Sequence, residues 1–307
     1  MQRMKELSIL IPCFNHVCVP LVSALVRQAK SMPGLAFEVV VLDDGSDDAD
    51  AVEVNLAIDG MEHCRYLRLP SNTGRSAARN RLANEAAYPL LLFLDCRHAL
   101  PDGRFLARYL EAGEADVVNG GYRPVCDASR QGGNLRYRYE MAVAARKGGC
   151  SVHGEGYRNF CTNNFMARRE VMLACPFDET LRRYGYEDVL FGKRLHDQGF
   201  SIRHIDNPVV FSHFESNARF LCKTEEAMSS LYELRHSLEG YSTLLSVCGR
   251  LRGCGLARPL ASLLRPWLPL MRRSLSGNNP RVWIFQLYKL AFYLNVASEA
   301  RGGVGGR

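Results

Sequence analysis

The sequence lacks several features that would assign it to a familiar class. Its eleven cysteines are scattered, and no two stand at the CxxC spacing of zinc fingers or redox motifs. No window of about 18 apolar residues is uninterrupted, so a membrane-spanning helix is not expected. The opening MQRMKELSIL enters a strand-like run too early for a signal peptide. We therefore expect a folded protein of a reducing compartment, whose cysteines act as small buried residues.

Acidic residues are nearly absent from the last fifth of the chain. Residues 249–307 contain ten lysines and arginines but a single acid, Glu299, so this segment carries +9 of a chain whose net charge is +7. Residues 1–248 therefore carry −2. Positive charge confined to one segment suits an anionic partner, either nucleic acid or an anionic membrane surface.

The first hundred residues alternate predicted strands and helices. Short apolar runs predict buried strands, and apolar residues at helical spacing predict the helices between them. The strands are expected at residues 7–11, 37–42, 65–69 and 90–94, and the helices at residues 19–30 and from Arg75 onward. Strand–helix–strand units of this length form parallel sheets. The polar residues after each strand then meet at one sheet edge, where ligands bind in open α/β sheets.

Two acidic segments follow strands of this predicted sheet. In LLLFLDCRHAL, residues 90–100, the strand runs into Asp95, with Cys96, Arg97 and His98 beside it. Asp95 would point into a binding cleft, or it is a loop carboxylate that pairs with Arg97. Asp43-Asp44-Gly45-Ser46 ends the second strand and could equally form an Asx turn.

Four segments carry a resemblance to a known family. ILIPCFN, VVVLDDGSDD, NTGRSAARN and LLFLD resemble, in this order and spacing, the nucleotide-sugar-binding half of the family-2 glycosyltransferases. The resemblance covers roughly residues 7–215. It implies the GT-A fold, an α/β architecture with a Rossmann-like, mostly parallel central sheet flanked by helices. It also implies sugar transfer from a nucleoside diphosphate sugar to a hydroxyl, with inversion at the anomeric carbon.

The resemblance assigns donor-binding roles to residues at the strand ends. Phe14 would stack on the nucleotide base, Asp43 would accept the imide proton of uracil, and Arg75 would lie near the diphosphate. Without this resemblance, Arg75 would be interpreted as a solvent-exposed residue on the surface of a helix. The predicted donor-binding residues are Pro12, Phe14, Asn15, Asp43, Asp44, Arg75, Asp95 and Arg97.

The metal motif departs from the family pattern. Family members usually carry Asp-x-Asp, because a divalent cation that bridges two phosphates needs hard oxygen ligands; this chain has Asp95-Cys96-Arg97. Asp95 could hold Mn²⁺ or Mg²⁺ with a distant ligand, Arg97 could neutralise the leaving group without a metal, or catalysis is lost. The first interpretation is favoured, because His213 ends the last predicted strand, residues 208–213, at the position of a metal ligand in related enzymes.

The later motifs supply the acceptor side. Residues 185–195 resemble the family's Glu-Asp motif at the start of a helix, which implies that Asp188, with Glu187 beside it, removes the proton of the acceptor hydroxyl. Two acids at a helix amino end are also good partners of the helix dipole. Asn163 and Asn164 could hold sugar hydroxyls, or they could satisfy backbone groups in a bend.

We expect a GT-A domain over residues 1–217 and a helical basic extension over residues 218–307, with a flexible tail at 302–307. Prolines break the extension into short pieces. Its leucines, arginines and Trp267 suit a segment lying on an anionic bilayer, with a helical cap that has a solvated basic face as the alternative. Residues 116–122 predict one strand. The glycine-rich residues 148–156 suit a lid, with a disordered segment without function as the alternative.

The predicted function is that of an inverting hexosyl- or N-acetylhexosaminyl-transferase. The expected donor is a UDP-sugar and the acceptor a glycan or lipid-linked hydroxyl, in bacterial surface polysaccharide synthesis. The enzyme would be cytoplasmic and peripheral on the inner face of the cell membrane, without a nucleic-acid partner. The alternative is a non-catalytic nucleotide-sugar- or glycan-binding relative, because Arg97 replaces the second aspartate. A nucleotidyltransferase is disfavoured, because PCFNH is not the glycine-rich basic loop of that class. The sequence leaves the donor sugar, the linkage and the oligomeric state open.

Overall fold

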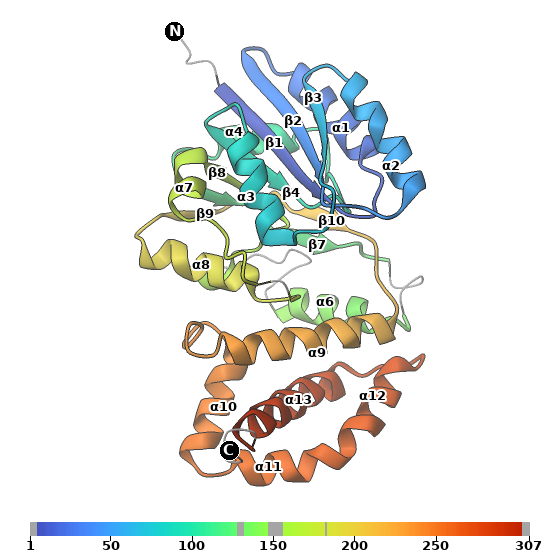
Figure 1. Ribbon diagram of the computed structural model, residues 1–307, viewed down its shortest axis with the longest axis vertical. Coiled ribbons are helices and arrows are strands. Elements are labelled where there is room, and N and C mark those ends of the chain that lie inside the picture. Colours follow the sequence, from blue (N-terminus) through green and yellow to red (C-terminus); the bar gives the residue numbers. More distant parts are fainter. Residues whose placement is uncertain (1–4, 128–131, 147–155, 182, 303–307) are drawn as a thin grey trace. The chain divides into compact units, whose positions relative to one another are not determined.

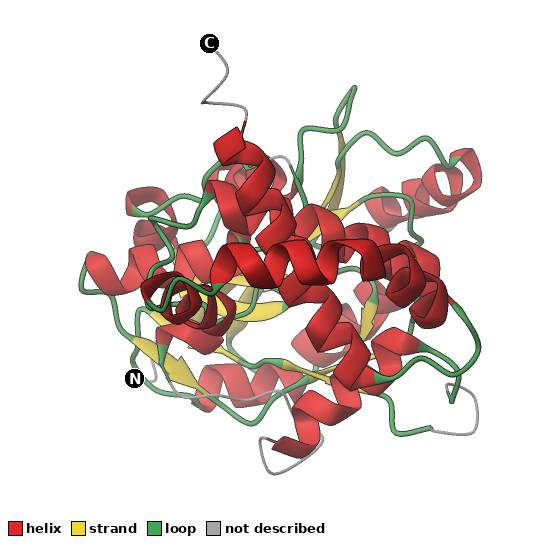
Figure 2. Cartoon of the chain, turned by 90° about the horizontal axis from the view of Figure 1, so that it is seen from below, coloured by secondary structure: helices red, strands yellow, loops and turns green. Residues whose placement is uncertain are grey.

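The computed structural model describes residues 5–127, 132–146, 156–181 and 183–302. The chain divides into two compact units: the first contains residues 1–125, 151–182 and 191–212, and the second contains residues 126–150, 183–190 and 213–307. Every described strand belongs to the first unit, and the regular structure described in the second is helical (Figures 1 and 2). The expected extension from residue 218 lies in the second unit. The suggested lid, apart from Gly156, and the tail beyond residue 302 lie outside the described residues.

A seven-stranded sheet in the order β3-β2-β1-β4-β8-β6-β9 forms the centre of the first unit. Its first four strands are parallel to one another. They are β1 (Lys5–Cys13), β2 (Leu35–Asp43), β3 (Cys64–Arg68) and β4 (Leu90–Leu94). This is the parallel arrangement that the alternating strands and helices predict.

The other half of the sheet reverses direction once. Strand β8 (Asn164–Arg168) runs antiparallel between β4 and β6 (Val117–Asn119), and β9 (Ile202–His204) pairs in parallel with β6. The sheet is therefore mostly parallel, as predicted, with a single antiparallel strand, β8, next to the central strand β4.

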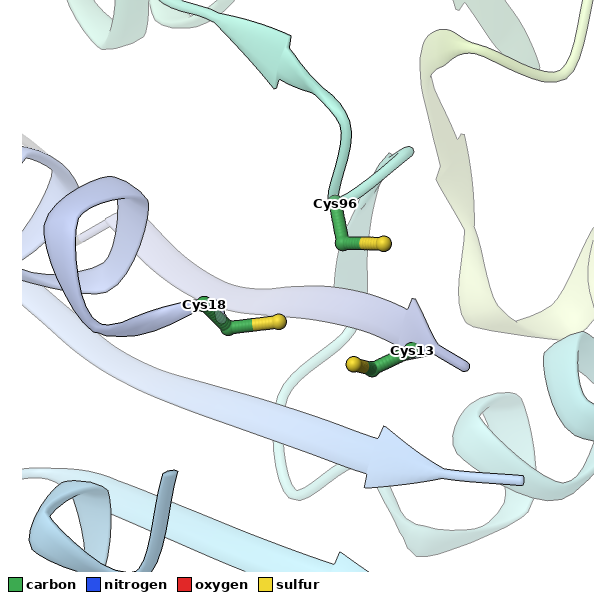
Figure 3. Close-up of side chains that lie close together, drawn as sticks. All are labelled: Cys13, Cys18 and Cys96. Carbon is green, nitrogen blue, oxygen red and sulfur yellow. The ribbon is translucent and has the colours of Figure 1, made fainter. Parts of the chain in front are cut away.

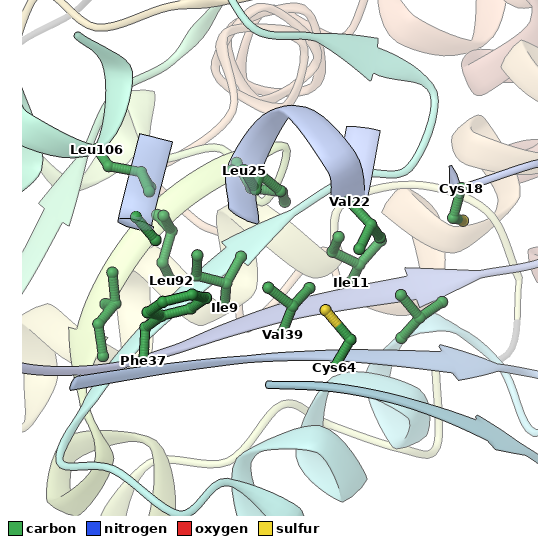
Figure 4. Packing of buried hydrophobic residues seen from close by; sticks show 14 of the residues in the cluster. Ile9, Ile11, Cys18, Val22, Leu25, Phe37, Val39, Cys64, Leu92 and Leu106 are labelled. Carbon is green, nitrogen blue, oxygen red and sulfur yellow. The ribbon is translucent and has the colours of Figure 1, made fainter. Parts of the chain in front are cut away.

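Both faces of the sheet are covered, which explains the uninterrupted apolar runs. Because side chains alternate along a strand, Ile9 packs with Val22 and Leu25 of helix α1 on one face (Figure 4), and Leu10 packs with Leu82 of α3 on the other. All five side chains are fully buried. Burying one such side chain stabilises the fold by about 1.5–3 kcal/mol. The described helices of this unit are α1 (Val19–Lys30), α2 (Ala49–Asn55), η1 (Leu56–Gly60), α3 (Arg75–Glu85), α4 (Phe105–Glu111), η2 (Tyr157–Asn159), α7 (Arg169–Ala174) and the part of α8 (Glu187–Asp197) from Phe191 onward.

The single strand predicted over residues 116–122 is wrong. The chain instead leaves the large sheet after β6 and enters a second sheet, ordered β5-β10-β7, as β7 (Tyr122–Pro124). Two glycines make this change of sheet possible. A Cβ on Gly120 would collide with the side chains of Tyr109 and Asn164, and Gly121 has a φ of 69° that favours glycine. The other strands of the second sheet are β5 (His98–Ala99) and β10 (Val209–Phe211).

The second unit has its own apolar core. Helix α13 packs against α9 and α11, and the buried side chains include Leu135, Phe220, Leu275, Phe285 and Tyr288. Prolines stand in the first turns of the short segments, where a missing N–H is tolerated. None of the helices described is long and apolar enough to cross a membrane. The helices described in this unit are the start of α8 up to Leu190, α6 (Leu135–Arg146), α9 (Asn217–Glu233), α10 (Thr243–Gly253), α11 (Ala257–Leu264), η3 (Arg265–Trp267), α12 (Leu268–Ser276) and α13 (Val282–Gly302).

Candidate functional site

The carboxyl ends of β1, β2 and β4 meet at one edge of the large sheet, because these strands run in parallel. Cys13 at the end of β1 stands opposite Asp43 at the end of β2, and Asp95 follows β4 directly. Pro12 has no N–H to donate. The pairing of β1 with β4 ends at Leu10, so the proline interrupts no hydrogen bond between these two strands. Phe14 is the first residue after β1. Residues of three strand ends are thereby brought to the same edge.

The two aspartates that end β2 are anchored within the protein. Asp43 is fully buried; its Oδ1 accepts the N–H of Ser46 at 2.7 Å, and its Oδ2 accepts the hydroxyl of Tyr66. Asp44 accepts both the N–H and the hydroxyl of Thr73, at 2.8 and 2.7 Å. The carboxylates therefore shape the loops of this edge, as in the Asx-turn interpretation of Asp43. Their contact with a donor stays a prediction.

Asn15 ties the end of β1 to the loop after β2. Its N–H donates to the hydroxyl of Ser46 at 2.8 Å, and its Oδ1 accepts the N–H groups of Asp47 and Asp48 at 3.0 and 3.2 Å. Its φ of 49° is left-handed, a conformation that asparagine tolerates. Phe14 beside it remains 38% exposed, so its ring face is available for stacking.

Asp95 combines partial exposure with a lowered pKa. Its side chain is 33% exposed, and its Oδ1 accepts the N–H of Arg97 at 3.0 Å and lies 3.6 Å from Nδ1 of His98. Burial acts to raise the pKa of this carboxyl, but His98, the N–H of Arg97 and the guanidinium of Arg79 hold it well below its usual range. Asp95 is therefore ionised near neutral pH and can act as a hard oxygen ligand.

Arg75 and Arg97 bring positive charge to the same unit. Arg75 is the exposed first residue of α3, and Gly74 before it provides no side-chain cap. A helix amino end of this kind favours an anion. The guanidinium of Arg97 lies 3.4 Å from the carbonyl oxygen of Phe14. Arg97 donates to Asp95 through its backbone N–H, whereas its side chain is directed at Phe14. The sequence had suggested that Asp95 pairs with Arg97 as a loop carboxylate.

His98 and Arg79 are two buried residues of this edge to which the sequence assigned no site role. The ring of His98 lies between Asp95 and Asn163, with Nε2 3.4 Å from the amide nitrogen of Asn163. Arg79 is 4% exposed, and its guanidinium lies 5.5 Å from the ring centre of Phe177. Two short spacings in the sequence could have indicated these residues. His98 follows Asp95 by three residues, and Arg79 stands one helical turn after Arg75, the predicted donor-binding residue of α3.

The two asparagines at the start of β8 have different surroundings. Asn164 is fully buried: its Oδ1 accepts the hydroxyl of Tyr109 at 2.6 Å, and its amide donates to the carbonyls of Gly121 and Asn207 at 3.0 and 2.7 Å. This side chain satisfies backbone groups, one of the two alternatives open from the sequence. Asn163 precedes the strand and is partly exposed.

Glu187 and Asp188 belong to the second unit and are the first residues of α8. Glu187 accepts the N–H of Gly185 at 3.1 Å, and Asp188 accepts the N–H of Val189 at 2.8 Å. Both acids are partly exposed, and their position suits the helix dipole. His213, also in the second unit, is exposed and stands two residues beyond β10, so the prediction that it ends that strand is wrong.

The described residues fit a divalent cation that is shared with the substrate. Among them, one group of three or more His, Cys, Asp or Glu side chains converges, and it consists of cysteines, so these residues form no all-protein cage of hard ligands. Nucleotide sites often hold Mg²⁺ through one or two carboxylates and the substrate phosphates. Asp95 can supply one such carboxylate.

Two solved structures share the fold of this chain. The crystallised fragment 1–349 of S. aureus TarS matches with a TM-score of 0.52 and 16% identity, over 97% of this chain and 92% of that one. The mannosyltransferase PcManGT from Pyrobaculum calidifontis matches with a TM-score of 0.50 and 14% identity, over 95% of this chain and 85% of that one. Identities this low establish the fold alone, which is the predicted GT-A fold.

The family follows from the sequence match. The family model described as "Glycosyl transferase family 2" matches residues 8–175, more than half of the chain. The chain therefore belongs to glycosyltransferase family 2, as its motifs predicted. The hyaluronan synthase of Pasteurella multocida is 25% identical over 240 residues, which are 67% of this chain and 24% of that protein. This chain thus corresponds to about a quarter of that relative's length.

Proposed function

We propose that this glycosyltransferase moves a hexosyl or N-acetylhexosaminyl group from a UDP-sugar to a hydroxyl of a glycan or lipid-linked acceptor, with inversion at the anomeric carbon. The observation that carries the proposal is the set of groups around one sheet edge. Phe14 offers an exposed ring, Arg75 a guanidinium at a helix amino end, and Asp95 an ionised carboxylate. These groups match the base, the diphosphate and the cation of a nucleotide-sugar complex.

Two similar proteins were crystallised with donors: TarS 1–349 with UDP-GlcNAc, and PcManGT with GDP-Man and Mn²⁺. We favour uridine for this chain because of Asp43. Its two oxygens each accept one hydrogen bond, from Ser46 and Tyr66, but a carboxylate oxygen has two lone pairs. One lone pair on each oxygen is therefore left, and one of the two would accept the imide proton of a uracil ring that stacks on Phe14.

In the proposed reaction, Asp188 is the general base. It takes the proton of the acceptor hydroxyl while that oxygen bonds to the anomeric carbon and the bond to the diphosphate breaks on the opposite face. Glu187 holds the turn before α8 through the N–H of Gly185. That turn is strained at Tyr186, which has a φ of 70°, whereas Gly185 adopts its φ of 101° without strain. Such strain often accompanies groups that must be held in one orientation.

The diphosphate must be stabilised as it leaves. When bound, Mn²⁺ or Mg²⁺ would neutralise its developing charge. We propose Asp95 as a protein ligand of that cation; a metal-binding role of His213 stays a prediction from the sequence. Arg75 and Arg97 would pair with the phosphate oxygens, and Asn163 would hold an acceptor hydroxyl.

The test of the proposal is the Asp188→Asn variant, assayed with a panel of UDP-sugars. We expect kcat to fall by about 10²–10⁴-fold while UDP affinity is unchanged, because the base acts only in the chemical step. Asp197→Asn, at the other end of the same helix, is the matched control and should retain activity. Full turnover by Asp188→Asn would refute the assignment of the base.

The rival function, a non-catalytic binding protein, is motivated by Arg97 at the position of the second family aspartate. It predicts that the wild type binds a UDP-sugar but turns over no donor, with or without Mn²⁺. Donor turnover that depends on Asp188 would exclude this rival.

We also propose a peripheral membrane location on the anionic inner face of a bacterial cell membrane, consistent with a lipid-linked acceptor in surface polysaccharide synthesis. Leu263, Trp267 and Leu270 follow one another at helical spacing across α11, η3 and α12, and each is more than half exposed. Exposed arginines, among them Arg258 and Arg273, flank this apolar stripe. Apolar side chains with basic neighbours suit binding to an anionic bilayer surface.

A further inference from the structure

Three cysteine side chains from separate segments converge at the edge of the large sheet. Cys13 ends β1, Cys18 is the N-cap of α1, and Cys96 follows Asp95 after β4. Their three sulfur atoms all lie within 4.8 Å of one another (Figure 3). The cysteines are 2%, 0% and 7% exposed. Their sequence positions gave no sign of this, because they match no metal-binding spacing.

We propose that Cys13, Cys18 and Cys96 form a binding site for a soft divalent metal ion such as Zn²⁺ or Cd²⁺. In a tetrahedral site, zinc–sulfur bonds of about 2.3 Å place the ligand sulfurs about 3.8 Å apart, so each sulfur needs to move by less than about 1 Å. Figure 3 shows the side chains of Cys13 and Cys18 pointing toward one another, with that of Cys96 beside them. The site therefore exists before the ion binds.

A fourth ligand lies next to the sulfurs. The carbonyl oxygen of His16 is 3.1 Å from the sulfur of Cys13, and the sulfur of Cys18 lies 3.8 Å from the same oxygen. Three sulfurs and one oxygen would complete the four-coordinate geometry that zinc prefers.

Loading the ion displaces protons. A divalent ion that binds all three sulfurs as thiolates displaces the three thiol protons, which pass to water. The loaded cluster then carries a net charge of −1.

The sulfur site selects different ions from the proposed donor site. Thiolates favour soft ions, whereas a carboxylate and phosphates favour Mg²⁺ or Mn²⁺. Cys13 directly precedes Phe14, and Cys96 directly follows Asp95, so an ion here would fix the backbone next to both residues. The inference depends on the three sulfurs alone and holds whether or not the proposed donor chemistry is correct.

The test is a titration of the full chain with Cd²⁺, in the presence of a non-thiol reductant and excess Mg²⁺. The background variant replaces the exposed Cys126, Cys222 and Cys254 with serine, and also Cys150, which lies outside the described residues. We expect one equivalent of Cd²⁺ to produce a thiolate-to-metal charge-transfer band and to raise the melting temperature.

Single substitutions to serine at Cys13, Cys18 or Cys96 should each weaken Cd²⁺ binding by at least about 100-fold. The matched controls are Cys64→Ser and Cys175→Ser, which change buried cysteines outside the cluster and should leave binding unchanged.

A second measurement needs no substitution in the cluster. Bound Cd²⁺ should protect Cys13, Cys18 and Cys96 from alkylation during partial denaturation, as mapped by mass spectrometry of peptides. Alkylation unaffected by Cd²⁺ would overturn the proposal even if the serine variants fail to fold. Equal loss of the absorption band in the control variants would overturn it as well.

Discussion

At the residue scale, Phe14 is an exposed aromatic residue, and its ring is proposed to stack on the base of the donor nucleotide. Replacing it with alanine should raise the Kd for UDP by about two- to tenfold, because an aromatic contact contributes about 0.5–1.5 kcal/mol. The free energy of unfolding should change by less than about 0.5 kcal/mol, because the ring is 38% exposed. Calorimetric titration and urea unfolding measure the two quantities. Val54→Ala, at an exposed position of α2, is the control; equal UDP affinities of Phe14→Ala and Val54→Ala would contradict the stacking role.

Asp95 is the second residue with a separable role. Asp95→Asn removes the charge of the one carboxylate that we assign to the cation, so the increase in UDP affinity on adding Mn²⁺ should disappear, while affinity in a chelator changes little. Asp102→Asn, an exposed acid that pairs with Arg108, should retain the Mn²⁺ effect. Retention of the full Mn²⁺ effect in Asp95→Asn would favour the metal-free alternative, in which Arg97 neutralises the diphosphate.

At the scale of elements, Asn164 fastens β8 to its surroundings. Asn164→Ala should lower the free energy of unfolding by about 2–4 kcal/mol, because it leaves the Tyr109 hydroxyl and two buried carbonyls without their partner. Asn163→Ala should change stability by less than about 1 kcal/mol and instead raise the KM for the acceptor. Urea unfolding and steady-state kinetics of the two variants provide the comparison. Equal stabilities would contradict the structural role of Asn164.

The pairing of β6 with β9 contains a pH-sensitive contact. The N–H and hydroxyl of Ser201 both donate to Asp116 at 2.8 Å and lower the pKa of this carboxyl. A carboxyl with a lowered pKa stabilises the fold fully above its unfolded pKa of about 3.9 and loses that contribution as the pH falls toward the folded pKa. Asp116→Asn should therefore lower the free energy of unfolding by about 1 kcal/mol at pH 7, a value that allows for partial exposure.

The difference between wild type and Asp116→Asn should stay constant from about pH 8 to pH 5 and shrink below about pH 4. Urea unfolding at several pH values measures it. Glu114→Gln, at a neighbouring exposed position, should show no such dependence. A difference that grows on acidification would contradict the assignment.

At the scale of the whole molecule, the excess positive charge of the chain is concentrated in residues 249–307. Replacing Arg258, Arg273 and Arg281 together with alanine should weaken binding to anionic vesicles by roughly 100-fold or more, because each basic residue near such a surface contributes about 1 kcal/mol. A triple variant of the exposed Arg27, Arg81 and Arg104, all in the first unit, has the same net charge and should bind like the wild type. Sedimentation with phosphatidylserine vesicles is the assay. Equal binding by both triple variants would refute the assigned surface.

Much of the architecture was readable from local patterns. The predicted helix at residues 19–30 and the predicted strand at 90–94 have the bounds of α1 and β4, and the predicted helix start at Arg75 is that of α3. A strand that is buried on both faces of a parallel sheet is a continuous apolar run, whereas a half-exposed strand alternates apolar and polar residues. The first polar residues after the run then indicate where the strand ends. The strand-end motifs also sufficed to predict the family.

Contacts between distant residues settled the rest. The antiparallel insertion of β8, the burial of Asp43 against Tyr66 and the convergence of three cysteines each join segments that are far apart in the chain. Neighbouring residues do not encode such contacts, because each depends on how whole strands and helices pack. Local sequence therefore establishes which groups stand at the strand ends, whereas packing decides which of them are locked in place, as Asn164 is, and which remain accessible, as Phe14 does.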